Sequence, residues 1–180
     1  MVANVDRQFH DCPAPWEEDA LLGGATFAGE VVGGGDFVPP AMVDVFRGVE
    51  LNSDVSDYAD SDDNVATFNP GFVLNDMEAP VWLIFDSVAA DTTSFLVEST
   101  AGTPGLTYTV EAFNFGINDF EIIDTMGESF NNDTVDTFPI VPADRIDTGG
   151  EVRSRVGWRQ TGFVTNFPWV VSVDQTGWNQ

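Results

Sequence analysis

Short runs of apolar and β-branched residues, separated by turn residues at regular intervals, occupy the chain from Val65 onward. Thr, Val and Phe dominate these runs and good helix formers are scarce, so the runs favour strands over helices. We expect an all-β domain, an antiparallel two-sheet β-sandwich with a jelly-roll-like strand order. The expected strands are Val81–Phe85, Phe95–Glu98, Leu106–Phe115, Phe120–Thr125, Thr134–Ile140, Val152–Arg159 and Val170–Gln175.

The expected strand Val81–Phe85 is apolar at every position. Successive residues of a strand point to opposite faces of the sheet. An unbroken apolar run therefore predicts a central strand that is covered on both faces, with Trp82 buried.

The first 45 residues have little regular pattern. We expect residues 1–45 to form an N-terminal arm with edge strands near Thr26–Val32 and Val43–Val49, and a helical turn near Trp16–Leu22. No repeat or linker separates this arm from the β-sandwich core of residues 46–180. A length of 180 residues also suits a single domain.

The chain is strongly acidic, with 30 Asp and Glu against 6 basic residues, all of them Arg, and a net charge of −24. Such a field repels phosphate backbones and anionic lipids, which argues against nucleic-acid and membrane-surface binding. A hydrophobic content of 43% is nevertheless enough to form a core. The acidity then serves either a solvated surface in a salty medium, which we favour, or the capture of divalent cations.

The sequence contains no apolar run near the ~20 residues that span a membrane, and we expect no membrane insertion. The N-terminal residues lack the basic and apolar regions of a signal peptide, so an exported form would have lost its signal or would belong to a larger precursor. Cys12 and His10, the only residues of their kinds, can neither pair within the chain nor complete a four-ligand zinc site.

An acidic stretch between Asn52 and Asn64 is the best candidate for a metal site. Clustered oxygen ligands on a loop suit Ca²⁺, although the spacing does not match an EF-hand. Asp and Ser also favour turns through hydrogen bonds from side chain to backbone, without a metal, and we favour this alternative. The candidate ligands are Asp54, Asp57, Asp60, Asp62 and Asp63.

Half of all the cations lie on one expected strand. Alternate residues share a face, so Arg153, Arg155 and Arg159 line one side, opposite Val152, Val156 and Trp158. The interpretation we favour is a set of ion pairs with acids on neighbouring strands, each worth ~0–1 kcal/mol. The alternative is a docking stripe for carboxylates, either of an acidic sugar or of a second copy of the chain.

Aromatic residues make up 12% of the chain. A flat ring can cover the apolar face of a sugar, which makes Trp16, Trp158, Trp169 and Trp178 candidates for a stacking platform. Tryptophan in a sandwich is more often part of the core. The exposure of Trp169 and Trp178 decides between these interpretations.

Six motifs occur in order along the chain: Phe46-Arg47-Gly48, Ser61-Asp62-Asp63, Asn69-Pro70-Gly71-Phe72, Thr107–Phe115, Arg153–Arg159 and Phe167–Gln175. Through them, residues 46–178 resemble a domain that recurs in large proteins, predicted to be exported, of planctomycetes and related marine bacteria. That family has no assigned activity, so the resemblance implies a secreted or cell-surface location but no mechanism. It also implies that the second motif and the arginine strand are family features.

We favour the hypothesis of a non-catalytic extracellular structural or self-associating module, whose partners are copies of itself or a larger surface assembly. The alternative is a carbohydrate-binding module with a structural calcium ion. Its contacts would be Arg153, Arg155, Arg159, Trp158, Trp169 and Trp178. A further alternative is a glycosidase-like enzyme with two carboxylates, but no pair stands out among 30 acids and the only His lies in the arm, so we expect no enzyme.

Overall fold

The computed structural model describes residues 36–62, 64–74, 78–140, 144–163, 165 and 167–180. The expected strand Thr26–Val32, the helical turn near Trp16 and the pair His10 and Cys12 lie outside these residues. Asp63 of the acidic stretch lies outside them as well.

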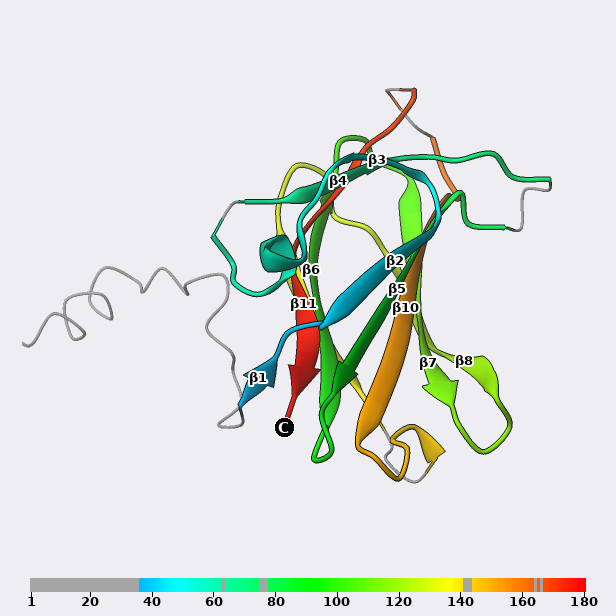
Figure 1. Ribbon diagram of the computed structural model, residues 1–180. Coiled ribbons are helices and arrows are strands. Elements are labelled where there is room, and N and C mark those ends of the chain that lie inside the picture. Colours follow the sequence, from blue (N-terminus) through cyan, green and yellow to red (C-terminus); the bar gives the residue numbers. More distant parts are fainter. Residues whose placement is uncertain (1–35, 63, 75–77, 141–143, 164, 166) are drawn as a thin grey trace, which may run out of the picture. The chain divides into compact units, whose positions relative to one another are not determined.

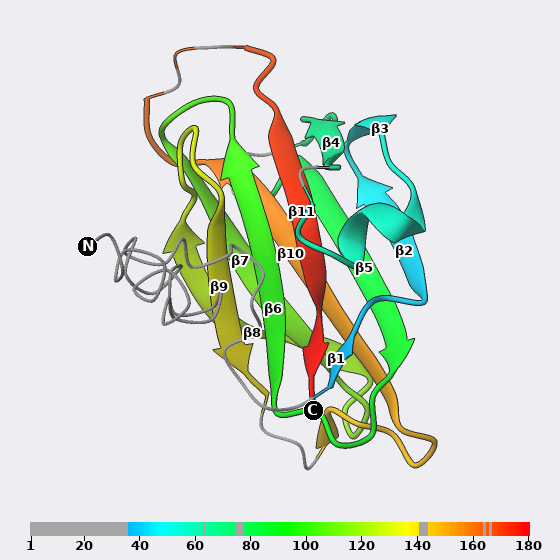
Figure 2. The same ribbon diagram turned by 90° about the vertical axis from the view of Figure 1, so that its left-hand side faces the viewer.

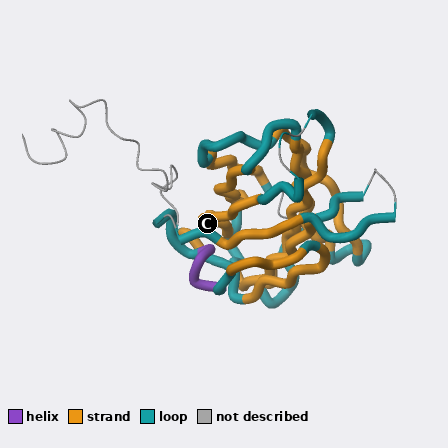
Figure 3. The backbone as a smooth tube through the Cα atoms, turned by 90° about the horizontal axis from the view of Figure 1, so that it is seen from above, coloured by secondary structure: helices purple, strands orange, loops and turns teal. Residues whose placement is uncertain are grey.

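The described residues form two antiparallel sheets, which lie one in front of the other in Figure 2. One sheet has the order β3-β4-β11-β6-β9, with β1 also paired to β11, and the other has the order β2-β5-β10-β7-β8 (Figure 1). Figure 3 shows this part of the chain as strands and loops with one short helical segment, η1. The elements are β1 (Phe37–Val38), β2 (Met42–Arg47), β3 (Val49–Asn52), η1 (Val55–Tyr58), β4 (Ala66–Asn69), β5 (Val81–Val88), β6 (Ser94–Ala101), β7 (Leu106–Asn114), β8 (Asp119–Gly127), β9 (Thr134–Pro139), β10 (Glu151–Gln160) and β11 (Val171–Asn179).

The order of the strands from β4 to β11 is that of a jelly roll. In the first sheet β11 lies between β4 and β6, and in the second β10 lies between β5 and β7, so the last two strands return between the earlier ones. Successive strands mostly change sheet, as two nested Greek keys require. The prediction of a jelly-roll-like sandwich is confirmed, and each strand expected after residue 80 is present.

The expected strand Val43–Val49 is divided at Gly48. The φ angle of Gly48 is 122°, a conformation that L side chains rarely adopt. At this point the chain leaves β2 in the second sheet and enters β3 in the first. The expected boundary between arm and core, at residue 46, therefore falls inside β2.

The core lies between the two sheets, and both sheets contribute aromatic side chains to it. Rings of Tyr58, Phe85, Phe95 and Trp178 form a row with neighbouring centroids 5.7, 5.9 and 5.2 Å apart. This row joins η1 to strands of both sheets. The packing of Tyr58 into this row therefore holds the short helix η1 in place.

Strand β5 does not match the expectation of burial on both faces. Val81, Leu83 and Phe85 are fully buried, whereas Trp82 and Ile84 are only partly buried. The core covers one side of this sheet, and the other side is the outer surface of the sandwich. The prediction that Trp82 is buried is therefore wrong, because an apolar run does not reveal whether a second layer covers it.

The carboxylate of Glu128 joins the two sheets from the inside. It accepts hydrogen bonds from Nε1 of Trp158 on β10, at 2.5 Å, and from Oγ of Ser99 on β6, at 3.0 Å. Burial raises the pKa of Glu128, and the hydrogen bonds from Trp158 and Ser99 partly oppose that rise.

This raised pKa predicts a pH dependence of stability. The stabilising contribution of the protonated Glu128 carboxyl is complete below the ordinary carboxyl pKa. It is lost as the pH rises through the pKa of Glu128 in the folded protein. As the pH rises above the ordinary carboxyl pKa, the free energy of unfolding of the wild type should therefore fall relative to that of Glu128→Gln. Urea unfolding followed by Trp fluorescence measures this difference, and a constant difference would contradict the prediction.

Candidate functional site

The outer surface of the β2-β5-β10-β7-β8 sheet carries aromatic and charged side chains from four neighbouring strands. Alternation on β5 and β10 turns Trp82, Arg153 and Arg155 to this side, away from the buried Val156 and Trp158. We call this set the aromatic–arginine face: Trp82, Asp86, Glu111, Phe113, Phe120, Arg153 and Arg155.

Arg155 occupies the middle of the face. Its guanidinium carbon lies 4.7 Å from the ring centroid of Trp82 and 4.2 Å from that of Phe120, so it links β5 to β8 across β10 and β7. Glu111, opposite it on β7, accepts from its Nε at 2.5 Å and forms an ion pair with a second nitrogen. Contacts of this kind hold a planar cation in one orientation.

Arg153, two residues before Arg155 on β10, makes contacts of the same kinds. It pairs with Asp86 on β5 and, at 3.3 Å, with Glu151, and its guanidinium carbon lies 5.3 Å from the ring centroid of Phe113. The predicted ion pairs between β10 and its neighbours are therefore confirmed for Arg153 and Arg155. Neither side chain offers an unpaired charge to a docking partner.

Gly157, the cross-strand partner of Trp82, has no side chain, so the indole of Trp82 can lie directly on the backbone of β10. A Cβ atom at Gly157 would lie 2.5–2.6 Å from three atoms of the Trp82 ring. The indole therefore covers the backbone of β10 at van der Waals contact. The position of the indole is therefore fixed, between the backbone of β10 and the guanidinium of Arg155.

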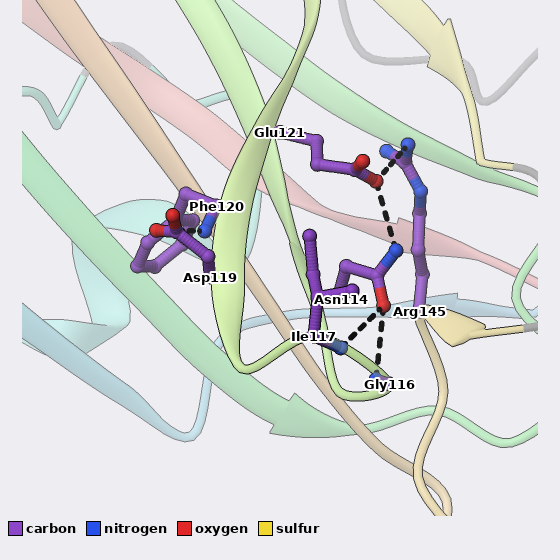
Figure 4. Close-up of polar contacts among 7 residues, drawn as sticks. All are labelled: Asn114, Gly116, Ile117, Asp119, Phe120, Glu121 and Arg145. Carbon is purple, nitrogen blue, oxygen red and sulfur yellow. Dashed lines mark hydrogen bonds and ion pairs between the residues drawn. The ribbon is translucent and has the colours of Figure 1, made fainter.

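The hairpin between β7 and β8, which carries Phe113 and Phe120, is fixed from its other side (Figure 4). Oδ1 of Asn114 accepts from the backbone of Gly116 at 2.9 Å, and its amide donates to Glu121 at 2.9 Å. Arg145 forms an ion pair with the same carboxylate at 3.0 Å. Glu121 and Phe120 lie on opposite sides of the ribbon, so these contacts position Phe120 without covering it.

Arg159 lies at one end of the face and lines a cavity of about 540 Å³. Residues between β4 and β5 and residues between β10 and β11 form its walls. Among the described residues no carboxylate forms an ion pair with Arg159, which distinguishes it from Arg153 and Arg155. The lining residues are Pro70, Gly71, Val73, Glu78, Pro80, Arg159, Gln160, Thr161, Gly162, Phe167 and Trp169.

The three described tryptophans offered as sugar contacts are part of the interior. Trp158 and Trp178 have no exposed surface and Trp169 is 2% exposed. Trp158 stacks on Tyr108 at 6.2 Å, and Trp178 contacts Phe95. The interpretation of these tryptophans as core residues is confirmed, and the alternative of a surface stacking platform is wrong, because each ring points to the side of its strand or loop that the core covers.

The acidic stretch forms local turns. Asp57, which is 4% exposed, accepts from the backbone of Asp54 and from the side chain of Asn64, each at 2.7 Å. Asp54 and Asp62 accept from the backbone of Ser56 and of Asn64. Among the described residues no group of three His, Cys, Asp or Glu side chains is placed to hold a metal ion. Calcium binding here stays a prediction.

Sequence reasoning missed five residues of the face as site residues: Trp82, Asp86, Glu111, Phe113 and Phe120. One signal was available, since Gly157 interrupts the bulky side chains of β10 and marks a position where another group approaches the backbone. The register that pairs Gly157 with Trp82 was not available from the sequence.

Of the described residues, none forms a helix long and apolar enough to cross a membrane.

No protein-family model matches the sequence, and no curated protein matches it. Among solved structures, a mutant of a family 29 carbohydrate-binding module is similar with 8% identity and a TM-score of 0.46, over 76% of this chain and 80% of that one. A family 28 module specific for non-crystalline cellulose has 9% identity and a TM-score of 0.46, over 64% of this chain and 74% of that one. At such low identities and scores, these likenesses do not establish what this chain binds.

Replacing Asp57 by Ala tests the role of the acidic stretch. The backbone N–H of Asp54 and the side-chain amide of Asn64 would lose their acceptor. We therefore expect a loss of about 1–3 kcal/mol in the free energy of unfolding. Asp60→Ala, in the same stretch, serves as the control. Equal stability of both variants in urea would contradict the structural role of Asp57.

Replacing Gly157 by Ala tests whether packing on the backbone at Gly157 fixes the position of the Trp82 indole. The new methyl group would displace the indole, and we expect a cost of about 1–3 kcal/mol and a change in the near-ultraviolet circular dichroism. Gly127→Ala on β8 is the matched control, since a Cβ there meets nothing within 4 Å. A loss of the same size in both variants would show that the packing on Trp82 is not responsible.

Proposed function

We propose that this domain is a non-catalytic module that binds a neutral polysaccharide chain on the aromatic–arginine face. The observation that carries the proposal is the seating of Trp82 on Gly157 beside the ion pair of Arg155 with Glu111. That arrangement fixes an aromatic ring and polar groups on the outer surface of one sheet. The contacts differ from those expected from the sequence, where buried tryptophans were the candidates.

The chemistry of the face suits a sugar. A pyranose has an apolar surface of C–H groups and a rim of hydroxyls that both donate and accept hydrogen bonds. Aromatic rings complement the first, and paired guanidinium and carboxylate groups complement the second. Because Arg155 and Glu111 hold each other in place, little side-chain entropy remains to be lost on binding.

Exposed apolar residues extend the same surface. Met42, Val88 and Ile122 are 53%, 66% and 65% exposed and lie on strands of this sheet. Contiguous exposed apolar surface on a folded domain commonly marks a binding site. A chain of several sugar units would cover more of this surface than a single sugar.

The charge of the protein favours a neutral ligand. The net charge of −24 repels uronates and sulfated glycans, and the carboxylates of the face neutralise its arginines. Self-association through the arginine strand stays a prediction without support from these contacts. A secreted or cell-surface location, where such a ligand would be met, is part of the proposal.

Trp82→Ala tests this function. Against a panel of cellohexaose, xylohexaose, mannohexaose and laminarihexaose, the wild type should bind at least one probe in isothermal titration calorimetry. Trp82→Ala should weaken that binding at least about tenfold, or about 1.4 kcal/mol, because the apolar contact of the indole is lost and Arg155 loses one of its supports. Its circular dichroism and urea midpoint establish whether it is folded.

Phe130→Ala is the matched control, since it removes an exposed ring that lies outside the face. Glu111→Gln is a second test, because it frees the guanidinium of Arg155 while it removes little volume. Unchanged affinity in folded Trp82→Ala and Glu111→Gln, or no binding of any probe by the wild type, would overturn the proposal.

A further inference from the structure

The cavity near Arg159 continues the aromatic–arginine face along β10. Arg159 follows Gly157 by two residues on the same side of the strand, which places their Cα atoms about 7 Å apart. Pro80 immediately precedes β5, on which Trp82 lies. A ligand that covers Trp82 and extends along β10 in this direction therefore reaches the cavity next.

Two segments that connect the sheets form the walls at this end. Residues 70–74 and 78–80 lie between β4 of one sheet and β5 of the other, and the described residues after β10 lead to β11. Backbone hydrogen bonds fix their bases, from Gly71 to Pro80 at 2.7 Å and from Gly162 to Gly105 at 2.8 Å. The open sheet surface thus ends at a walled hollow.

The polar groups in the cavity suit hydroxyls rather than an anion. Arg159 supplies donors, and Glu78 supplies acceptors and is held by Arg47 at 2.9 Å. Two neighbouring hydroxyls of a sugar both donate and accept, so they can satisfy the two residues together. A carboxylate in the same place would approach Glu78 and be repelled.

Two aromatic residues also line the cavity. The indole of Trp169 is buried behind the cavity, while the ring of Phe167 is 78% exposed at its edge. A volume of about 540 Å³ lies within the usual range of small-ligand pockets, about 300–1,000 Å³. Such a space accommodates one or two sugar units.

We propose that this cavity is the terminal subsite of the face and takes the end of the polysaccharide chain. The inference rests on the proposed function and makes it more specific: the module recognises chain ends rather than positions along the chain. Arg159, Glu78 and Phe167 contact the terminal unit, and Trp82 contacts a unit further along.

Two phenylalanines between β10 and β11 provide a matched test of the subsite, and Arg159 on β10 provides a second one. Phe167→Ala removes an exposed ring that lines the cavity, and Phe163→Ala removes one that is 80% exposed and does not line it. For the hexasaccharide that the wild type binds, Phe167→Ala and Arg159→Ala should each weaken binding at least about tenfold, and Phe163→Ala should not. Wild-type affinity in folded Phe167→Ala and Arg159→Ala would overturn the subsite.

A second measurement counts ends directly. A soluble polysaccharide with the same repeating unit as the bound hexasaccharide is partially hydrolysed. The amount of protein bound at saturation per gram of polysaccharide is measured before and after hydrolysis. Binding at chain ends predicts that this amount rises in proportion to the number of ends. An unchanged amount, with Trp82→Ala still defective, would overturn the subsite and leave the proposed function standing. Failure of the wild type to bind any probe would overturn both.

Discussion

The side chains of β10 alternate between the core and the outer surface, and most of the molecule depends on this one strand. It lies between β5 and β7, and its inner residues meet the opposite sheet through Val156 and Trp158. Its outer residues collect carboxylates from both neighbours, Asp86 from β5 and Glu111 from β7. The core and the candidate site are thus two sides of the same ten residues, and neither can shift without the other.

This arrangement also gives the few cations of an acidic chain a defined use. In solvent, an ion pair between exposed side chains contributes little to stability. Arg155 is different because rings on two sides and a carboxylate on a third restrict its motion. Arg153 and Arg155 thus fix the positions of neighbouring side chains on this sheet, while the net charge of −24 repels other polyanions.

The periodicity of the sequence was sufficient for the fold and insufficient for the site. Turn spacing and alternation predicted the strands after residue 80 and the partition of β10, because both are local properties of an extended chain. Trp82 was misjudged because a run of five apolar residues looks the same whether its sheet has one covered side or two. Trp169 and Trp178 were candidates for a similar reason, since loop-like neighbours do not reveal what packs over a ring. The partners of the arginines depend on strand register, which no single strand specifies.

The seat of Trp82 has a consequence for how such domains vary over evolution. The indole occupies the volume that a side chain at position 157 would need. An aromatic residue at position 82 and a glycine at position 157 are therefore two halves of one steric requirement, although 75 positions separate them in the chain. Related chains that preserve the surface should keep both, and chains that lose one should be free to lose the other. Covariation between these two positions would then trace which relatives retain this packing.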